Sequence, residues 1–442
     1  MDTLTTPGPN SLDAYWMPFT ANRDFKANAA LISHAEGLYY FTSNGHRLLD
    51  AIAGLWCVNA GHGHPRIVEA IQKQAARLDF ASSFGLGHPL VFEYANRLTS
   101  IAPADMNHVF FTNSGSEAAD TAIKIALAYH HARGEGQRQR VVGRQRGYHG
   151  VGFGGLSAAG MGPHKKQFGM LLPGAVHLPH THDQARNAFS LGQPRHGAEL
   201  ADALEQMIAT YDASTIAAVI VEPVAGSTGV LVPPVGYLER LRDLCSRHGI
   251  LLIFDEVVTG FGRLGRPFAA DRFGVRPDLL MVAKGMTNGA VPMGGVIASS
   301  AIYDTVTGKA ASGAVELSHG YTYSGHPLAA AAGLASLDVY VSEGLFERAA
   351  RLEPHWQTCA HSLKGLPGVV DIRNLGLLAG IELGEDPVSG KALARKVYEH
   401  CFEHGVLVRP VANTIVLSPP LTIGEHEVET IFATIEAALK AG

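Results

Sequence analysis

The chain has 442 residues, of which 46% are hydrophobic and 17% are charged. This composition is ordinary for a globular protein and excludes a disordered chain, and the length allows two domains. The net charge is −5 and no run of like charge stands out, which argues against nucleic-acid binding. The apolar runs are strand-sized and too short to cross a bilayer, so no membrane-spanning segment is expected.

Residues 1–30 show little periodicity and are expected to form an arm that packs on other structure. The first residues lack a basic region followed by an apolar core, so no signal peptide is expected. The four cysteines are far apart and predict no disulfide framework. These features favour a reducing, cytoplasmic compartment.

Regular structure is indicated from residue 37 onward. Residues 37–50 predict a hairpin around Ser43-Asn44-Gly45, and helices are expected at about 65–78 and after Pro89. Strands and helices then alternate. The expected strands are 108–112, 140–143, 216–221, 250–255, 278–283 and 295–298, and the clearest helices are 115–132 and 237–248. This alternation predicts an α/β fold with a mostly parallel sheet that is covered on both faces.

The composition changes after about Pro327. A long helix rich in alanine and leucine is followed by short strands, expected at 369–373, 378–382, 406–408 and 414–417. This pattern predicts a second, smaller α+β domain. We therefore divide the chain into an arm and part of the small domain (1–62), a large domain (63–326) and a C-terminal small domain (327–442).

Two apolar strands end in residues that carry chemistry. One runs into Asp255-Glu256, and the other ends at Lys284. Ligands of open α/β sheets bind just beyond the carboxyl ends of strands, and a lysine there is costly unless it has a function or a partner. The pair predicts a pyridoxal-phosphate site, where the amine forms an imine and the acid faces the pyridine nitrogen. An isolated acid at this place would more often cap a helix or pair with an arginine.

Ser114-Gly115-Ser116-Glu117 opens a predicted helix directly after a strand. The helix dipole and free N–H groups favour an anion there, which suggests a phosphate cradle. The same pattern also fits an ordinary N-cap with a capping-box glutamate. Tyr148 lies at another strand end, where it could stack on a planar cofactor or simply border the core.

Three other patterns are weaker. Gly260-x-Gly262-x-x-Gly265 matches a dinucleotide fingerprint, but Pro267 follows and no long helix is expected, so we reject it. The histidines of 62–64 and 177–182 lack both cysteines and a helical His-Glu-x-x-His pattern, so no metal site is predicted. Arg409 ends an apolar strand in the last domain and suits a carboxylate, although a surface arginine would look the same.

Taken together, these motifs resemble the class III, or omega-amino acid, aminotransferases, which are pyridoxal-phosphate-dependent transferases of fold type I. The matching segments are Asn113–Glu117, Gly147–Gly150, Leu251–Arg263, Pro277–Lys284, Met293–Gly295 and His319–Pro327. The resemblance covers nearly the whole chain. It implies a large domain with a mostly parallel sheet, a smaller α+β domain, and a homodimer that in some members is a dimer of dimers.

The resemblance also implies roles for individual residues. Lys284 would be the imine lysine and Asp255 the partner of the pyridine nitrogen. The remaining cofactor contacts would come from Gly115, Ser116, Tyr148, Glu222, Val257 and, from the neighbouring subunit, Thr322. Arg409 would bind carboxylates, and the pocket wall would be formed by Trp56, Phe19, Phe84 and Ala225.

Within the class, the similarity is greatest to the beta-alanine:pyruvate aminotransferases, through segments 16–23, 54–56 and 177–181. Members that use 2-oxoglutarate usually carry a glutamate after Val-Glu-Pro, and segment 221–230 has none, which favours pyruvate. Phe19 replaces the tyrosine of many members, which leaves the donor open. The alternative is an amine:pyruvate or taurine:pyruvate transaminase, and the fold also hosts aminomutases and decarboxylases.

Overall fold

The computed structural model describes residues 11–169, 171–385 and 393–441. Its main feature is a seven-stranded sheet in the order β4-β10-β9-β8-β7-β5-β6. Among the described strands of this sheet, only β10 runs against the others. The strands are β4 (Met106–Thr112), β5 (Arg140–Arg144), β6 (Ala175–Leu178), β7 (Ile216–Val221), β8 (Leu251–Asp255), β9 (Leu279–Ala283) and β10 (Gly294–Ser299). The predicted mostly parallel sheet is confirmed.

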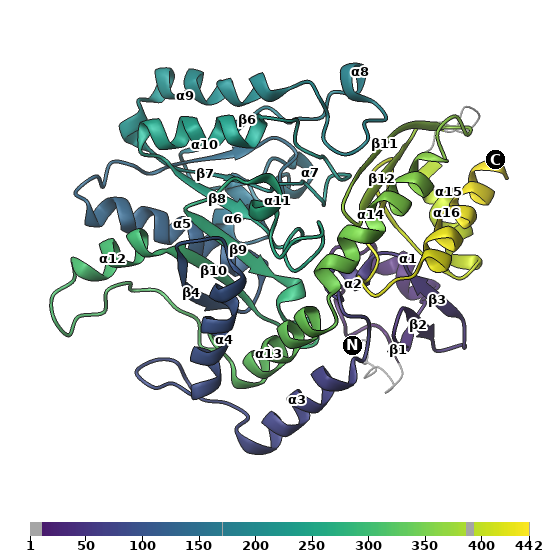
Figure 1. The fold of residues 1–442 in the computed structure, drawn as a ribbon, viewed down its shortest axis with the longest axis horizontal. Coiled ribbons are helices and arrows are strands. Elements are labelled where there is room, and N and C mark those ends of the chain that lie inside the picture. The colour runs from purple at the N-terminus through teal and green to yellow at the C-terminus, as the bar shows by residue number, and fades with distance from the viewer. Residues whose placement is uncertain (1–10, 170, 386–392, 442) are drawn as a thin grey trace, which may run out of the picture.

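Helices cover both faces of this sheet (Figure 1). Every residue of β8 is buried, because alternate side chains face opposite layers. Ile253 packs in the cluster that contains α5, whereas Leu252 and Phe254 pack in the cluster that contains α10. The helices of this part are α3 (Pro65–Arg77), α4 (Pro89–Ile101), α5 (Gly115–Ala132), α6 (Phe153–Ala158), α7 (Gly162–Lys165), α8 (Gln184–Asn187), α9 (Ala203–Tyr211), α10 (Tyr237–His248), α11 (Ala269–Phe273) and α12 (Ser300–Gly308).

The smaller part joins both ends of the chain (Figure 1). One sheet has the order β1-β2-β3-β13 and the other β11-β12-β15-β14. Their strands are β1 (Ile32–Glu36), β2 (Tyr39–Thr42), β3 (Arg47–Asp50), β11 (Val369–Leu375), β12 (Leu378–Leu383), β13 (Val406–Leu407), β14 (Arg409–Val411) and β15 (Thr414–Leu417). The helices are α14 (Leu345–His361), α15 (Leu393–Glu403) and α16 (Glu425–Lys440). The long helix α13 (Pro327–Ser342) packs against α3 and α4.

Several local expectations are confirmed and some need correction. The hairpin of β2 and β3 is present, and α10 ends at Gly249 in the left-handed conformation, as expected. The arm contains a short helix, α1 (Asn22–Ala27), that its sequence did not predict. Arg409 does not end the strand 406–408. It begins β14, after β13 has ended at Leu407.

No single described helix is long and apolar enough to cross a membrane, although the bent pair α13 and α14 passes a test of length and composition. All four cysteines are free.

Candidate active site

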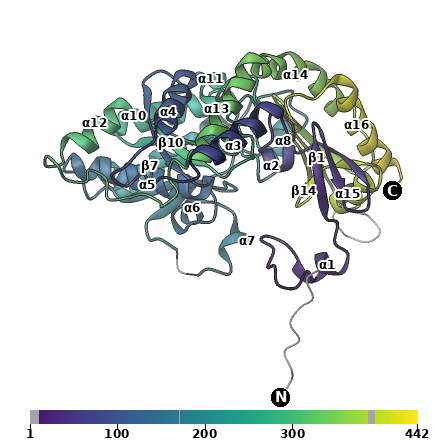
Figure 2. The same cartoon turned by 90° about the horizontal axis from the view of Figure 1, so that it is seen from below.

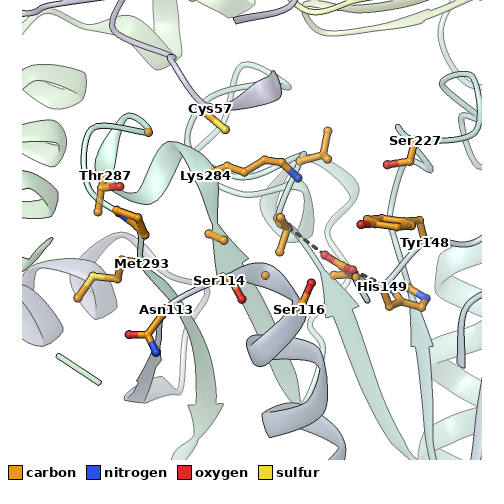
Figure 3. Close-up of a pocket in the computed structure, with 18 of the residues that line it drawn as sticks. Cys57, Asn113, Ser114, Ser116, Tyr148, His149, Ser227, Lys284, Thr287 and Met293 are labelled. Atoms are coloured by element: carbon orange, nitrogen blue, oxygen red, sulfur yellow. Dashed lines mark hydrogen bonds and ion pairs between the residues drawn. The ribbon is translucent and has the colours of Figure 1, made fainter. Parts of the chain in front are cut away.

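The two strand ends that carry chemistry lie side by side. Strands β8 and β9 are parallel neighbours, and Asp255 is in register with Met281, three residues before Lys284. Both side chains line a cavity of about 280 Å³ at the carboxyl ends of the strands. Lys284 approaches this cavity from the end of β9, Ser116 from the start of α5, and Tyr148 and His149 from the loop after β5 (Figure 3).

Lys284 is held in an unusual conformation with little to satisfy its charge. Its φ is +53°, in the left-handed region that costs a residue with a side chain roughly 1 kcal/mol or more. The described residues offer its Nζ no hydrogen bond or ion pair, and the nearest ring is Trp56, with its centroid 5.6 Å away. Burial lowers the pKa of Lys284, opposed by Cys57, Asp255 and Glu222. The site therefore favours a neutral, nucleophilic amine.

Asp255 has a fixed orientation. Its Oδ2 lies 2.8 Å from Nδ1 of the buried His149, and its Oδ1 accepts the N–H of Val257 at 3.1 Å. The chain turns after β8, which ends at Asp255. Asp255 and Val257 line the cavity, and Glu256 faces away to accept the N–H groups of α11.

The start of α5 serves as both a helix cap and a candidate phosphate site. Ser114 Oγ accepts the N–H of Glu117 at 3.2 Å, so the N-cap interpretation is correct. Gly115 and Ser116 nevertheless line the cavity, and the first N–H groups of a helix have no partner within it. A Cβ at Gly115 would lie 3.0 Å from a Val257 methyl group, so glycine allows the helix to approach the cavity floor.

Tyr148 and Glu222 border the opposite side of the cavity. Glu222 follows β7 and is buried, and its Oε2 accepts the N–H of Tyr148 at 3.1 Å. Burial raises the pKa of Glu222 to about 7, and the charge of Asp255 adds to this while His149 and Arg144 oppose it. Burial, together with both carboxylates, also raises the pKa of Tyr148.

Trp56 connects the lysine to the predicted carboxylate-binding arginine. The Arg409 guanidinium carbon lies 5.5 Å from the Trp56 ring centroid, and Lys284 Nζ lies 5.6 Å from it. Asp50 supports the loop that carries Trp56, because its carboxylate accepts the N–H groups of Ile52 and Gly54 at 3.0 and 2.6 Å. The loop therefore places one aromatic ring near two cationic side chains.

Six predicted site residues do not line the cavity of the single chain, namely Trp56, Arg409, Phe19, Phe84, Ala225 and Thr322. Phe19 and Phe84 are 74% and 61% exposed, and Thr322 is exposed as well. Phe19 lies on the arm, and the centroid of its ring is 5.3 Å from that of His164 on α7. Figure 2 shows α1 of the arm and α7 on the same side of the molecule. Ala225 is buried and pairs with Leu231.

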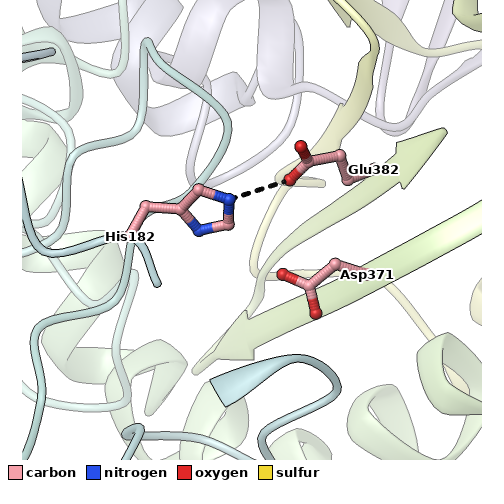
Figure 4. A group of neighbouring side chains, drawn as sticks. All are labelled: His182, Asp371 and Glu382. Atoms are coloured by element: carbon pink, nitrogen blue, oxygen red, sulfur yellow. Dashed lines mark ion pairs between the residues drawn. The ribbon is translucent and has the colours of Figure 1, made fainter. Parts of the chain in front are cut away.

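Three of the histidines in segments 62–64 and 177–182 have acidic partners, whereas His177 bonds to the carbonyls of Ser157 and Ala159. His62 bonds to Asp50 at 2.8 Å and His64 to Glu343 at 3.0 Å. His182, Asp371 and Glu382 have ligand atoms within 4.8 Å of one another and resemble a metal site (Figure 4). However, Arg373 already pairs with both carboxylates and lies 2.5 Å from Asp371. We call these four residues, His182, Asp371, Arg373 and Glu382, the Arg373 cluster.

The glycines of the rejected dinucleotide fingerprint serve to pack the segment against a helix. The segment after β8 forms turns, and the next helix, α11, has only five residues. A Cβ at Gly262 would lie 2.5 Å from the Phe346 ring, and one at Gly265 would lie 2.9 Å from Ala350. Both glycines therefore admit α14, and no dinucleotide loop is present in the described segment.

Sequence reasoning missed three residues at the site: Asp50, Cys57 and His149. His149 was visible only as the neighbour of Tyr148, and its partner Asp255 is 106 residues away. Cys57 lines the cavity near Lys284, and burial raises the pKa of its thiol. For Asp50, the signal in the sequence was an acidic residue at the end of a buried strand, which indicates that its carboxylate holds the loop that follows.

The class of the protein follows from this fold and site together with one family comparison. Residues 20–439 match the model of the class III aminotransferases, and the chain belongs to that family. It is a transaminase of fold type I that depends on pyridoxal phosphate.

Individual relatives are similar over nearly their whole length. The chain is 57% identical to an omega-aminotransferase of Caulobacter vibrioides, with 98% of both chains covered. It is 47% identical to a beta-alanine–pyruvate aminotransferase of Pseudomonas aeruginosa, over 97% of this chain and 96% of the relative. A PLP-bound amine transaminase from an uncultivated Pseudomonas species superposes with a TM-score of 0.90 at 37% identity, covering 97% and 98% of the two chains.

The cavity suits this cofactor chemically. It offers unpaired helix N–H groups for a phosphate, a buried carboxylate for a pyridine nitrogen, and an amine without a hydrogen-bond partner among the described residues. A planar ring would find Tyr148 and Val257 among the lining side chains.

Proposed function

We propose that this enzyme moves the terminal amino group of an omega-amino acid, with beta-alanine as the expected donor, to pyruvate. The products are a semialdehyde and L-alanine. The observation that supports this most strongly is that Lys284 Nζ and the Arg409 guanidinium carbon both lie close to the Trp56 ring, at 5.6 and 5.5 Å from its centroid. An omega-amino acid has an amine at one end, which would react at the cofactor beside Lys284, and a carboxylate at the other, which Arg409 would bind.

The cofactor supplies an electron sink when it is bound. Gly115 and Ser116 would hold its phosphate, and Asp255 would keep its pyridine nitrogen protonated. Tyr148 would stack on one face of its ring and Val257 would pack on the other. Lys284, released from the cofactor by the donor's amine, would move a proton from the donor carbon to the cofactor.

Arg409 would bind the donor's distal carboxylate and then the carboxylate of pyruvate. It has a favourable setting for this, because none of the ion pairs among the described residues involves its guanidinium. The cavity-side segment after Glu222 includes Ala225 and Ser227 and no acid that could occupy the arginine. The relative from Pseudomonas aeruginosa is named for beta-alanine and pyruvate, which supports the same assignment.

The proposal extends to a homodimer, with a dimer of dimers as the larger form, in the cytoplasm. Thr322 is predicted to contact the cofactor and Phe84 to shape the substrate pocket, yet both are exposed and lie outside the cavity of a single chain. A second copy would supply them to the neighbouring site.

Lys284→Ala is expected to remove the visible absorbance of the bound cofactor and to reduce alanine formation from pyruvate and beta-alanine to background. Lys165→Ala is the matched control. Burial lowers the pKa of Lys165 too, but it bonds to Ser157 and lies outside the cavity. Absorbance spectra and a coupled alanine assay on both variants decide the matter, and full turnover in Lys284→Ala would refute the assignment.

Arg409→Ala tests the substrate class. With pyruvate as acceptor, we expect kcat/KM for beta-alanine to fall about 10-fold to 150-fold more than kcat/KM for an uncharged arylalkyl amine, as loss of a charged hydrogen bond predicts. Equal losses for both donors would remove Arg409 from donor binding. A wild-type preference for uncharged amines or for taurine in the same panel would favour the alternative transaminase.

A further inference from the structure

The buried histidine that holds Asp255 has a second nitrogen without a partner. His149 Nδ1 lies 2.8 Å from Asp255 Oδ2, and its side chain is completely buried. No group in the described residues bonds to its Nε2. An unsatisfied buried polar atom costs about 1–3 kcal/mol, so a missing partner is expected.

The surroundings of Gly147 indicate where that partner lies. A Cβ built on this buried glycine would have three nearest heavy atoms, and all are polar. They are Arg144 O at 2.9 Å, His149 Nε2 at 3.4 Å and Glu222 Oε2 at 3.5 Å. Because residue 147 has no side chain, all three polar atoms surround the position that its Cβ would occupy.

This arrangement has the chemistry of a buried water site. Buried waters typically make about three hydrogen bonds to polar groups that would otherwise be unsatisfied. Here only His149 Nε2 lacks a partner among the described residues, because Arg144 O already accepts the N–H of Gly147 and Glu222 Oε2 that of Tyr148, and each of these two groups has a further lone pair for a water. His149 and Glu222 are 1% and 5% exposed, so bulk solvent does not reach them freely.

We propose that a water molecule beside Gly147 joins Glu222 to His149, so that Glu222 is a positioning residue that acts on Asp255 through His149. We call His149, Glu222 and Asp255 the cavity triad. His149 Nδ1–H donates to Asp255, which already accepts the N–H of Val257, and the water donates to Nε2. A protonated Glu222 donates to the water, which then donates to Nε2 and to Arg144 O. An ionised Glu222 accepts the second hydrogen of the water in place of Arg144 O, so the link between Glu222 and His149 persists in both states.

The link would fix the neutral tautomer of His149 and direct the charge of Asp255 toward the cofactor. Other charged groups also act on Glu222, namely Asp255 and the buried Arg144, and Lys284 lies across the cavity. The inference rests on the proposed position of the cofactor against Asp255, and it does not depend on which donor or acceptor the enzyme uses.

A crystal structure of the holoenzyme at high resolution is the direct test. It should show one ordered water within hydrogen-bond distance of both His149 Nε2 and a Glu222 oxygen. An empty space, or a direct bond between the two side chains, would overturn the proposal. Neither result would bear on transamination, which the Lys284→Ala experiment tests separately.

A spectroscopic double-mutant cycle tests the coupling itself. The readout is the midpoint pH at which the visible band of the bound cofactor changes, in wild type, Glu222→Leu, His149→Leu and the double variant. We expect each single change to move the midpoint by about 0.5 pH unit or more, and the double variant to match His149→Leu alone. Additive shifts would show that Glu222 acts on the cofactor directly and would overturn the proposal.

Glu222→Gln serves as the conservative variant. Its amide can donate to the same water, so the midpoint should return toward the wild-type value, whereas a purely steric or charge effect would leave it with Glu222→Leu. If either leucine variant fails to bind cofactor, the crystal structure and the comparison of Glu222→Gln with wild type still decide the proposal.

Discussion

The cavity triad and the Arg373 cluster both contain a histidine, an aspartate and a glutamate. They differ in how completely these side chains are paired by hydrogen bonds and opposite charges. In the Arg373 cluster, one guanidinium pairs with both carboxylates and also donates to Gly229 O at 2.9 Å. In the cavity triad, by contrast, the described residues leave one imidazole nitrogen unpaired and offer the carboxylate of a buried glutamate a single donor, a backbone N–H.

The pKa values follow this difference. The hydrogen bond from His182 and the charge of Arg373 lower the pKa of Glu382 to about 2, against the effect of burial. Burial instead raises the pKa of Glu222 to about 7. The Arg373 cluster has the closer set of charged side chains, but its carboxylates are already paired with a cation. The cavity triad has a nitrogen that no described residue pairs, and it lines the cavity, so it is the functional centre.

The largest expected effect is on stability. Arg373→Met would leave the buried carboxylate of Asp371 and the partly buried carboxylate of Glu382 without their cation, and should lower the free energy of unfolding by about 3–5 kcal/mol. Urea denaturation of the full chain measures this. Arg186→Met is the control, because Arg186 forms its ion pairs at the surface and should change the midpoint little. An unchanged midpoint in Arg373→Met would mean that the cluster is not structural.

The reverse pattern is expected for Asp255→Asn. This change keeps the shape of the side chain but removes the charge beside the cofactor, so kcat should fall about 100-fold, equivalent to about 2.7 kcal/mol. The denaturation midpoint should move far less than in Arg373→Met. Steady-state kinetics and urea denaturation on the same samples give both numbers. If Asp255→Asn lost stability but kept its kcat, the assigned roles of the two groups would be reversed.

The smallest effect is the pH dependence of stability, which should have opposite signs in the two groups. Glu382, with its lowered pKa, stabilises the fold above pH 4.5, and this is lost as pH falls from 4.5 toward 2. Glu222, with its raised pKa, keeps a proton that the unfolded chain releases, so its contribution is lost as pH rises from 4.5 to about 7.

The corresponding glutamine variants separate the loss of stability in acid from the loss between pH 4.5 and 7. Glu382→Gln should flatten the loss of stability in acid, and Glu222→Gln should flatten the decline between pH 4.5 and 7, each on the order of 1–3 kcal/mol. Denaturant midpoints across the pH range, without added cofactor, provide the measurement. A steeper acid limb in Glu382→Gln would contradict the assigned sign.

The strands and the central pair of site residues could be predicted because local sequence determines them. An unbroken apolar run such as β9 can only be buried on both faces, and a lysine placed directly after it is conspicuous. The contact between His149 and Asp255 could not be predicted, since it depends on the order in which β5, β7 and β8 lie in the sheet.

The environment of Trp56 was hidden for a different reason. Ala53 and Trp56 both have positive φ values, which no propensity predicts for these residue types and which the Asp50 carboxylate supports from outside the loop. The positions of Phe19 and Phe84 depend on surfaces that a single chain leaves exposed. Sequence patterns identify such residues without locating them.

The pairing of β13 with β3 has a consequence for synthesis on the ribosome. Leu49 of β3 pairs with Val406 of β13, so this pairing can form only after nearly the whole chain has been synthesised. At about 5–20 residues per second, the N-terminal hairpin waits roughly 20–70 s for this strand. Because Asp50 ends β3 and supports the Trp56 loop, the wall of the cavity would be completed last, when translation is nearly over.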